Sequence, residues 1–295
     1  MKPARFVLFS AALLLVLTII SGVNGCGNAP AETANSGLVV SFVKEAPPAS
    51  VTVGREFPIR IDVLNQGGEF VNKGQAKFYL SGLGQNFENV KSSLTNEKTL
   101  SKEAVFSDTL TFADNAKYTF PLQSLQIVPL VLTACYDYSG RAQATLCIAG
   151  SNSSKVCSLS GDKINSNTAG PVQISGVSET IIGTKLVLSF DIVNKGNGEV
   201  FLPSTDCDKL ESNDATESSK QKKLSLKLTT TDRFVCKMQS ETGQVEGLEG
   251  TVPVGKIIIC EKDISNKDYS SALIMDFRYK YRESISQSIN VLPAA

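Results

Sequence analysis

Six cysteines are the residues of this chain best suited to covalent chemistry. They lie after residue 130 in two clusters of three: Cys135, Cys147, Cys157, Cys207, Cys236 and Cys260. In an oxidising compartment six cysteines indicate disulfides, and fifteen complete pairings are possible. Because each cluster holds an odd number, full oxidation requires at least one bond between the clusters. Otherwise each cluster keeps one free thiol.

The spacing within each cluster favours short cross-links. We expect Cys147 to pair with Cys157, which would tie a final strand to the segment after it. In the second cluster either Cys236–Cys260 or Cys207–Cys236 can form. The chain contains no C-x-x-C motif and no histidine, and the spacings do not match a tetrahedral zinc site. Structural disulfides are therefore favoured over a redox or metal site.

The composition removes several classes of catalysis. With no histidine, the chain cannot build a Ser-His-Asp triad, a Cys-His pair or a histidine general base. It also has no tryptophan. No sequence motif indicates a pair of carboxylates placed for glycoside hydrolysis. We expect a protein that is not an enzyme, with no cofactor and no metal site.

An acidic run surrounds Cys207 and is the one local group of hard oxygen ligands. It comprises Asp206, Asp208, Glu211 and Asp214. Carboxylates can hold Ca²⁺, but the run lacks the regular spacing of an EF-hand loop. A solvated loop is the favoured interpretation, and calcium binding is left open.

The charge balance argues against a nucleic-acid partner. Lys and Arg total 29, as do Asp and Glu, so the formal net charge is zero. The basic clusters at 222–223 and 278–282 are short, and we interpret them as solvated faces or hairpin ends. Tyr136, Tyr138 and Tyr279 alternate with polar residues, which predicts a position in the core or on a sheet face.

The N-terminus predicts export. Lys2 and Arg5 precede an apolar run of 15 residues, 6–20, which fits a secretory signal better than a membrane span of about 20 residues. The next residues, Val23-Asn24-Gly25-Cys26, resemble a lipobox, with Cys26 as the lipidated residue, although Asn24 departs from the pattern. Three outcomes stay open: a lipid anchor at Cys26, conventional cleavage nearby, or a retained anchor helix.

Between this segment and the folded part lies a short tether. We assign residues 1–25 to the signal or anchor and residues 26–37 to a flexible tether rich in small polar residues. Asn152 begins an Asn-Ser-Ser sequon and is a candidate glycosylation site.

After residue 37 the pattern is that of short strands. Apolar residues alternate with polar ones between Gly, Asn, Asp and Pro, which is typical of half-buried antiparallel strands. Two sets should each share one inward face: Phe57, Ile59, Ile61 and Val63, and then Leu186, Leu188, Phe190 and Ile192. Many such strands at short spacing predict an all-β sandwich or barrel.

The strands occur in two related sets. Residues 54–67 and 183–196 align without gaps at an offset of 129, with four identical positions of fourteen. Near the end of each set, residues 134–138 match 275–279 at an offset of 141. We therefore predict two copies of one domain, residues 38–150 and 171–293, joined by a Ser-, Asn- and Gly-rich linker at 151–170.

The strand that ends in Asn-x-Gly and then resumes resembles the CARDB type of immunoglobulin-like domain. The Cys-Tyr-Asp-Tyr segment at 135–138 and the spaced cysteines are similar to those of uncharacterised secreted archaeal proteins. The resemblance covers most of residues 38–292. It implies two tandem immunoglobulin-like antiparallel β-sandwiches and a role in adhesion or surface interaction.

These features predict a non-catalytic binding or adhesion module on the extracellular face of the cytoplasmic membrane, at the cell surface. Its expected partners are the membrane, through the N-terminus, and a surface protein or glycan. The alternative is a structural subunit of a surface assembly or filament joined by β-strand addition.

Overall fold

The alternating segments form antiparallel strands in the computed structural model, which describes residues 36–102, 107–150, 154–240, 243–247, 249–264 and 267–294. The first half contains a 3₁₀ helix at Gly84–Asn86 and eight strands: β1 (Leu38–Phe42), β2 (Ser50–Thr52), β3 (Glu56–Asn65), β4 (Ala76–Ser81), β5 (Phe87–Glu88), β6 (Ser93–Thr95), β7 (Asp108–Tyr118) and β8 (Gln126–Ile148). The predicted signal segment and Cys26 lie outside the described residues, as does Asn152.

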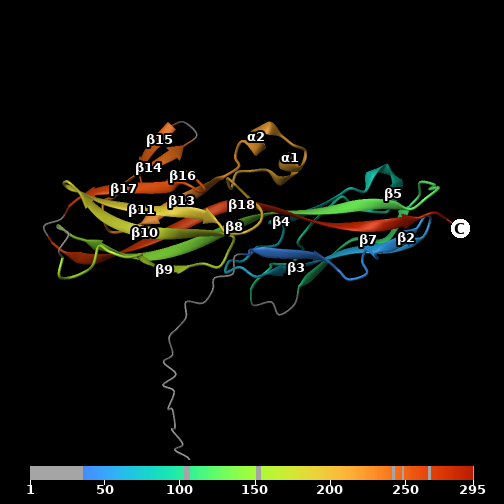
Figure 1. Ribbon diagram of the computed structural model, residues 1–295, viewed down its shortest axis with the longest axis horizontal. Coiled ribbons are helices and arrows are strands. Elements are labelled where there is room, and N and C mark those ends of the chain that lie inside the picture. Colours follow the sequence, from blue (N-terminus) through green and yellow to red (C-terminus); the bar gives the residue numbers. More distant parts are fainter. Residues whose placement is uncertain are drawn as a thin grey trace, which may run out of the picture. The chain divides into compact units, whose positions relative to one another are not determined.

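The second half adds ten strands and two short helices (Figure 1). The strands are β9 (Ile164–Asn167), β10 (Val172–Ile182), β11 (Lys185–Asn194), β12 (Glu199–Phe201), β13 (Lys223–Thr229), β14 (Val235–Ser240), β15 (Gly243–Gly247), β16 (Glu249–Pro253), β17 (Ile257–Asp263) and β18 (Tyr269–Leu292). The helices are α1 (Cys207–Glu211) and α2 (Ala215–Ser218). The prediction of a mostly β fold with antiparallel sheets is confirmed.

The strands are organised into two sheets. One has the order β1-β3-β7-β5, and the other has the order β10-β11-β17-β14-β16-β13-β18-β8-β4-β6. Four further strands attach to this second sheet: β2 and β12 to β18, β9 to β8, and β15 to β14. Among these pairings only that of β2 with β18 is parallel.

The longest pairing joins β8 to β18, and Figure 1 shows these two ribbons side by side. Its antiparallel register runs from Val291 opposite Gln126 to Tyr269 opposite Ile148. The early part of β8 also pairs with β4 and its later part with β9, whereas the early part of β18 pairs with β13. Each long strand therefore pairs with strands of both halves, and one continuous sheet contains strands from both sides of the predicted linker. The limits of the two predicted domains stay a prediction.

The two inward faces predicted from the alternation are confirmed. All eight side chains, from Phe57 to Val63 and from Leu186 to Ile192, are buried at no more than 4% exposure. They belong to one hydrophobic core that draws residues from both halves. Burial of this apolar area is the main favourable contribution to folding.

Each Asn-x-Gly segment makes the same turn. The Asn65 amide donates to the Glu69 carbonyl at 2.7 Å, and its Oδ1 accepts from the Gly67 N–H at 3.0 Å. In the second half the Asn194 amide donates to the Gly198 carbonyl at 2.8 Å. These bonds replace the strand ladder where each strand ends, which is the local role expected of Asn in turns.

A tyrosine from the long ladder braces each turn. The Tyr138 hydroxyl accepts from the Glu69 N–H at 3.4 Å, and the Tyr281 hydroxyl accepts from the Gly198 N–H at 2.7 Å. The counterpart of Tyr138 is thus Tyr281, at an offset of 143, and the alignment at 141 was wrong by two residues. Alternation repeats every two residues, so a shift of two leaves every side chain on its predicted face.

The two tyrosines that make these hydrogen bonds lie on either side of one cross-strand pair. Asp137 lies directly opposite Lys280 on the ladder, and the two side chains form an ion pair at 2.8 Å. The positions 137 and 280 also differ by 143, the offset that relates Tyr138 to Tyr281. Asp137 and Lys280 therefore occupy equivalent positions in the two halves. Tyr136 opposite Tyr281 and Tyr138 opposite Tyr279 flank it, with ring centroids 5.8 Å apart in both pairs.

We expect Tyr138→Phe to lower the free energy of unfolding by about 1 kcal/mol, since it leaves the Glu69 N–H and the Ala169 carbonyl without this hydroxyl. Urea unfolding of purified protein measures the change. Tyr279→Phe is the matched control, because the Tyr279 hydroxyl makes no hydrogen bond of good geometry with described residues. An equal loss in both variants would contradict the bracing role of Tyr138.

Candidate functional site: a polar groove on the long strand pair

Three disulfides cross-link the fold. Cys147 pairs with Cys157, as predicted, and Cys236 pairs with Cys260, one of the two alternatives left open. The third joins Cys135 to Cys207 across 72 residues and is the bond between clusters that full oxidation requires. Three disulfides indicate that the folded chain belongs in an oxidising environment, outside the reducing cytosol.

The segment that carries Cys207 does not form the simple loop that its polarity suggests. Asp206 caps α1 by accepting from the Asp208 N–H, and Asp214 caps α2 by accepting from the Thr216 and Glu217 N–H groups. Asp at these positions satisfies N–H groups that a helix start leaves without partners. We call residues 206–221 the helical insertion.

The helical insertion belongs to the second half but binds the first. Besides the Cys135–Cys207 bond, Asp208 accepts from the Tyr79 hydroxyl at 2.7 Å and pairs with Lys77. These two donors hold the pKa of the Asp208 carboxyl below its ordinary value, with the Lys77 hydrogen bond as the largest cause. The insertion therefore fixes the two halves against each other by a covalent bond and by charge.

These contacts account for the acidic run. Asp206 and Asp214 cap helices, Asp208 binds Lys77 and Tyr79, and Glu211 pairs with Arg282 at 3.1 Å. Across the part of the chain that the structure describes, no group of three or more acidic, Cys or His residues is arranged to hold a metal. The run therefore acts in helix capping and in ion pairs with Lys77 and Arg282.

On the outward face of the β8–β18 ladder, charged and polar residues lie opposite one another. The order along the ladder is Asp137 opposite Lys280, Ser139 opposite Arg278, and Arg141 opposite Asp276. Arg141 and Asp276 form an ion pair at 2.6 Å. Beyond Asp137 and Lys280, at the other end of this row, Cys135 lies opposite Arg282. Helix α1 covers this pair, because its Cys207 is bonded to Cys135 and its Glu211 pairs with Arg282.

The uncovered part of this face forms a hollow with two loops, residues 66–75 and 202–206. We call this hollow the ladder groove. It measures about 520 Å³ and is lined by Glu69, Phe70, Asn72, Gln75, Asp137 and Arg278, among others. Pro203, just before the helical insertion, closes one side, and an adjoining hollow of about 670 Å³ extends it past Arg141 and Lys227.

Two charges in the ladder groove make no close ion pair, although the Glu69 carboxylate, after Asp276, contributes to raising the pKa of Arg141. Within the described residues neither the Glu69 carboxylate nor the Arg278 guanidinium makes an ion pair or a side-chain hydrogen bond. Their neighbours Asp137 and Arg141 are both paired. Beside them the Phe70 ring is 59% exposed. An acceptor, a donor and an apolar ring are thus available to a ligand at one place.

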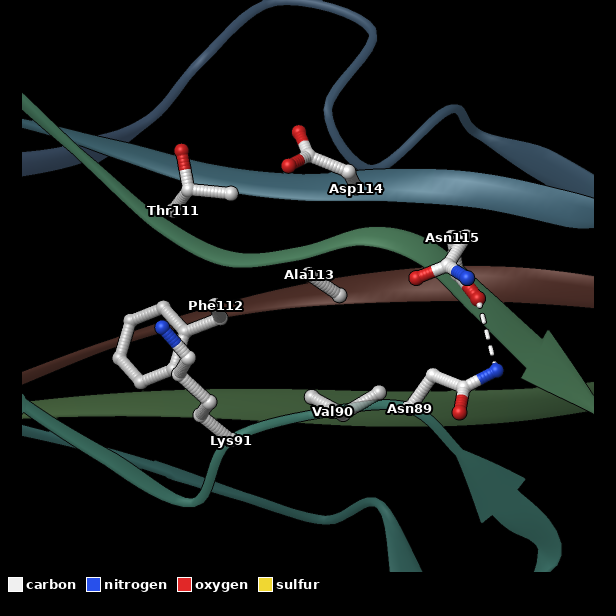
Figure 2. A pocket seen from close by; sticks show the side chains of 8 residues that line it. All are labelled: Asn89, Val90, Lys91, Thr111, Phe112, Ala113, Asp114 and Asn115. Carbon is white, nitrogen blue, oxygen red and sulfur yellow. Dashed lines mark hydrogen bonds between the residues drawn. The ribbon is translucent and has the colours of Figure 1, made fainter.

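A second hollow, of about 460 Å³, lies beside β7 (Figure 2). Figure 2 shows Asn89 bonded to the Asn115 carbonyl, and the Lys91 N–H donates to the Phe112 carbonyl at 3.0 Å. Its one carboxylate, Asp114, is paired with Arg60 at 2.6 Å. This hollow offers fewer free groups than the ladder groove and makes Lys91 a suitable control position.

Two carboxyls, the buried Glu179 and the half-buried Glu283, have a pKa that burial raises. Burial raises the pKa of Glu179 to about 7 against a hydrogen bond from the Cys147 N–H and the charge of Lys163. Burial alone raises the pKa of Glu283 to about 7, and its Oε1 has no hydrogen-bond partner among described residues. Both groups face the interior and not the ladder groove.

Sequence patterns predicted the positions of some of these residues and missed others. Tyr136, Tyr138 and Tyr279 are buried, as predicted. The basic cluster at 278–282 was interpreted as a solvated face, but two of its cations, Lys280 and Arg282, are paired with acids. Glu69 and Phe70 were not singled out, because only the ladder register brings their turn beside Arg278.

No helix among the described residues has both the length and the apolar character needed to cross a membrane. Searches of protein-family models and of curated proteins find no match to this chain.

Proposed function

We propose that this protein is an exported, membrane-anchored cell-surface binding module, built from two tandem immunoglobulin-like sandwiches of the CARDB type. The three disulfides support an extracytoplasmic location. The turn and tyrosine bonds that recur in both halves support two copies of one domain.

The observation that carries the proposal is the pair of unpaired charges, Glu69 and Arg278, in the ladder groove. A hollow in which a few charged or polar groups are held beside an apolar ring has the general form of a ligand-binding site. The frame is rigid here because Tyr138 braces the Glu69 turn and the Cys135–Cys207 bond holds the opposite wall. The site needs no general base, so a binding function fits a chain without histidine.

The edge strand β10 is poorly suited to strand addition. The Asn167 side chain donates to the Ile174 carbonyl and accepts from the Ile174 N–H, and the Lys163 N–H donates to the Val177 carbonyl. These bonds occupy edge groups that an added strand would use. A filament joined through β10 would have to displace them.

The test measures binding of the full chain, purified in detergent, to a surface fraction of the cells that produce it. We expect saturable binding that Arg278→Ala weakens by about tenfold, which corresponds to about 1.4 kcal/mol. Lys91→Ala, in the second hollow, should bind like the unaltered protein.

Equal binding by Arg278→Ala and the unaltered chain would remove the ladder groove as the binding site. Concentration-dependent filaments of the purified chain, with no binding to the surface fraction, would instead favour the structural-subunit alternative.

A further inference from the structure

We propose that the ladder groove binds a neutral oligosaccharide. This inference rests on the proposed binding function and specifies the chemical class of its ligand. It follows from the charges, the exposed ring and the free amides that line the same hollow.

The charge of the groove argues for a neutral ligand. Its two unpaired charges are of opposite sign, Glu69 and Arg278, and the adjacent charges cancel in the pairs Asp137–Lys280 and Arg141–Asp276. A phosphate or sulfate bound to Arg278 would meet the Glu69 carboxylate, and a cationic peptide bound to Glu69 would meet the guanidinium. Like-charge contacts of this kind oppose binding.

The hydroxyls of a sugar can bind the carboxylate and the guanidinium of the groove at the same time. A hydroxyl donates one hydrogen bond and accepts others, so neighbouring hydroxyls can donate to the Glu69 carboxylate and accept from the Arg278 guanidinium. Hydrogen bonds to charged groups are the stronger ones. The groove thus matches a ligand that carries several hydroxyls and no net charge.

The remaining lining adds apolar and amide contacts. Phe70, 59% exposed, presents a ring on which the C–H face of a sugar can pack. The Gln75 Oε1 accepts from the Asn72 N–H, which orients the Gln75 amide, while the Asn72 side chain has no hydrogen bond within the described residues. Both amides line the same hollow as Phe70.

The groove is also held in shape before any ligand arrives. Asn65 fixes the turn that carries Glu69, and the Tyr138 hydroxyl binds the Glu69 N–H. Arg278 extends from the paired strand β18, opposite Ser139. Weak hydroxyl contacts give measurable affinity only when little ordering is required on binding.

The experiment uses the full chain in a detergent without a sugar headgroup and four immobilised hexasaccharides, of glucose, mannose, galactose and N-acetylglucosamine. We expect saturable binding to at least one of them, little changed between 50 mM and 500 mM NaCl. Arg278→Ala, Glu69→Gln and Phe70→Ala should each weaken it about tenfold, while Lys91→Ala should leave it unchanged. All four positions are partly or fully exposed, so the variants are expected to fold.

Binding of none of the four sugars would overturn the inference, as would binding that the three groove variants leave unchanged. Stronger binding to a sulfated hexasaccharide, lost at 500 mM NaCl, would identify an anion site instead. If the sugars fail but Arg278→Ala still weakens binding to the cell-surface fraction, the proposed function stands and only the ligand class is wrong. If neither ligand binds, both proposals fail.

Discussion

Replacing Cys135 and Cys207 together by alanine is expected to lower the free energy of unfolding by about 4 kcal/mol. The bond closes 72 residues of chain, the longest separation of the three, so its loss releases the most entropy in the unfolded state. The variant also loses the packing of these sulfurs against Tyr79. Urea unfolding under non-reducing conditions measures the change.

The matched control is the double alanine variant at Cys147 and Cys157. That bond closes only 10 residues, and its loss should cost roughly 2.5 kcal/mol by the same relation. If the two variants lose equal stability, the longer span of the Cys135–Cys207 bond adds nothing to its contribution. An unchanged midpoint for the Cys135 and Cys207 variant would show that Asp208 and Glu211 hold the insertion unaided.

The second large effect concerns pH. The pKa of Glu283 is about 7 in the folded chain against an ordinary value of 4.5, because burial disfavours its charged form. Its contribution to stability is fully present below pH 4.5 and is lost as the pH rises through 7. Between pH 4.5 and 8 this group should lower the free energy of unfolding by about 3 kcal/mol.

Glu283→Gln tests this directly, since glutamine has a similar shape and no charge. We expect the variant to be more stable than the unaltered chain by about 3 kcal/mol at pH 8 and nearly equal to it at pH 4.5. Denaturant titrations across this range measure the difference. A difference that stays constant with pH would show that Glu283 does not titrate there.

Glu179 is the internal comparison for that experiment. Its pKa is also raised to about 7, so Glu283→Gln should retain the Glu179 share of the pH dependence. The double variant with Glu179→Gln should be nearly flat between pH 5 and 8. Asp208 and Asp232, whose pKa values are lowered, act on stability only at more acidic pH.

Local patterns predicted the strands because side-chain direction in a strand repeats every two residues. The alternate apolar residues within 57–63 and 186–192 could be assigned to inward faces from their types alone, and all eight are buried. The same period made the match of residues 134–138 ambiguous, since offsets of 141 and 143 place identical faces inward. Only the hydroxyl contacts of Tyr138 and Tyr281 distinguish them.

The polarity of the helical insertion predicted a loop, and two short helices form there instead. Asp206 and Asp214 are good helix caps, but each helix is only one turn long and is too short to be stable by itself. The disulfide to Cys135 and the contact with Tyr79 fix the segment. Tertiary contacts of this kind leave no periodic signal in a sequence.

Residue type, short spacing and parity are enough to predict the β-strand character, the inward faces, the Asn-x-Gly turns and the need for a disulfide between clusters. The folded chain establishes which cysteines pair, which ladder register joins β8 to β18, and which charges make no ion pair. Those outcomes depend on residues far apart in the chain: Cys135 and Cys207, Asp137 and Lys280, Glu69 and Arg278. The ladder groove exists because one long strand pair brings a turn of the first half beside a strand of the second.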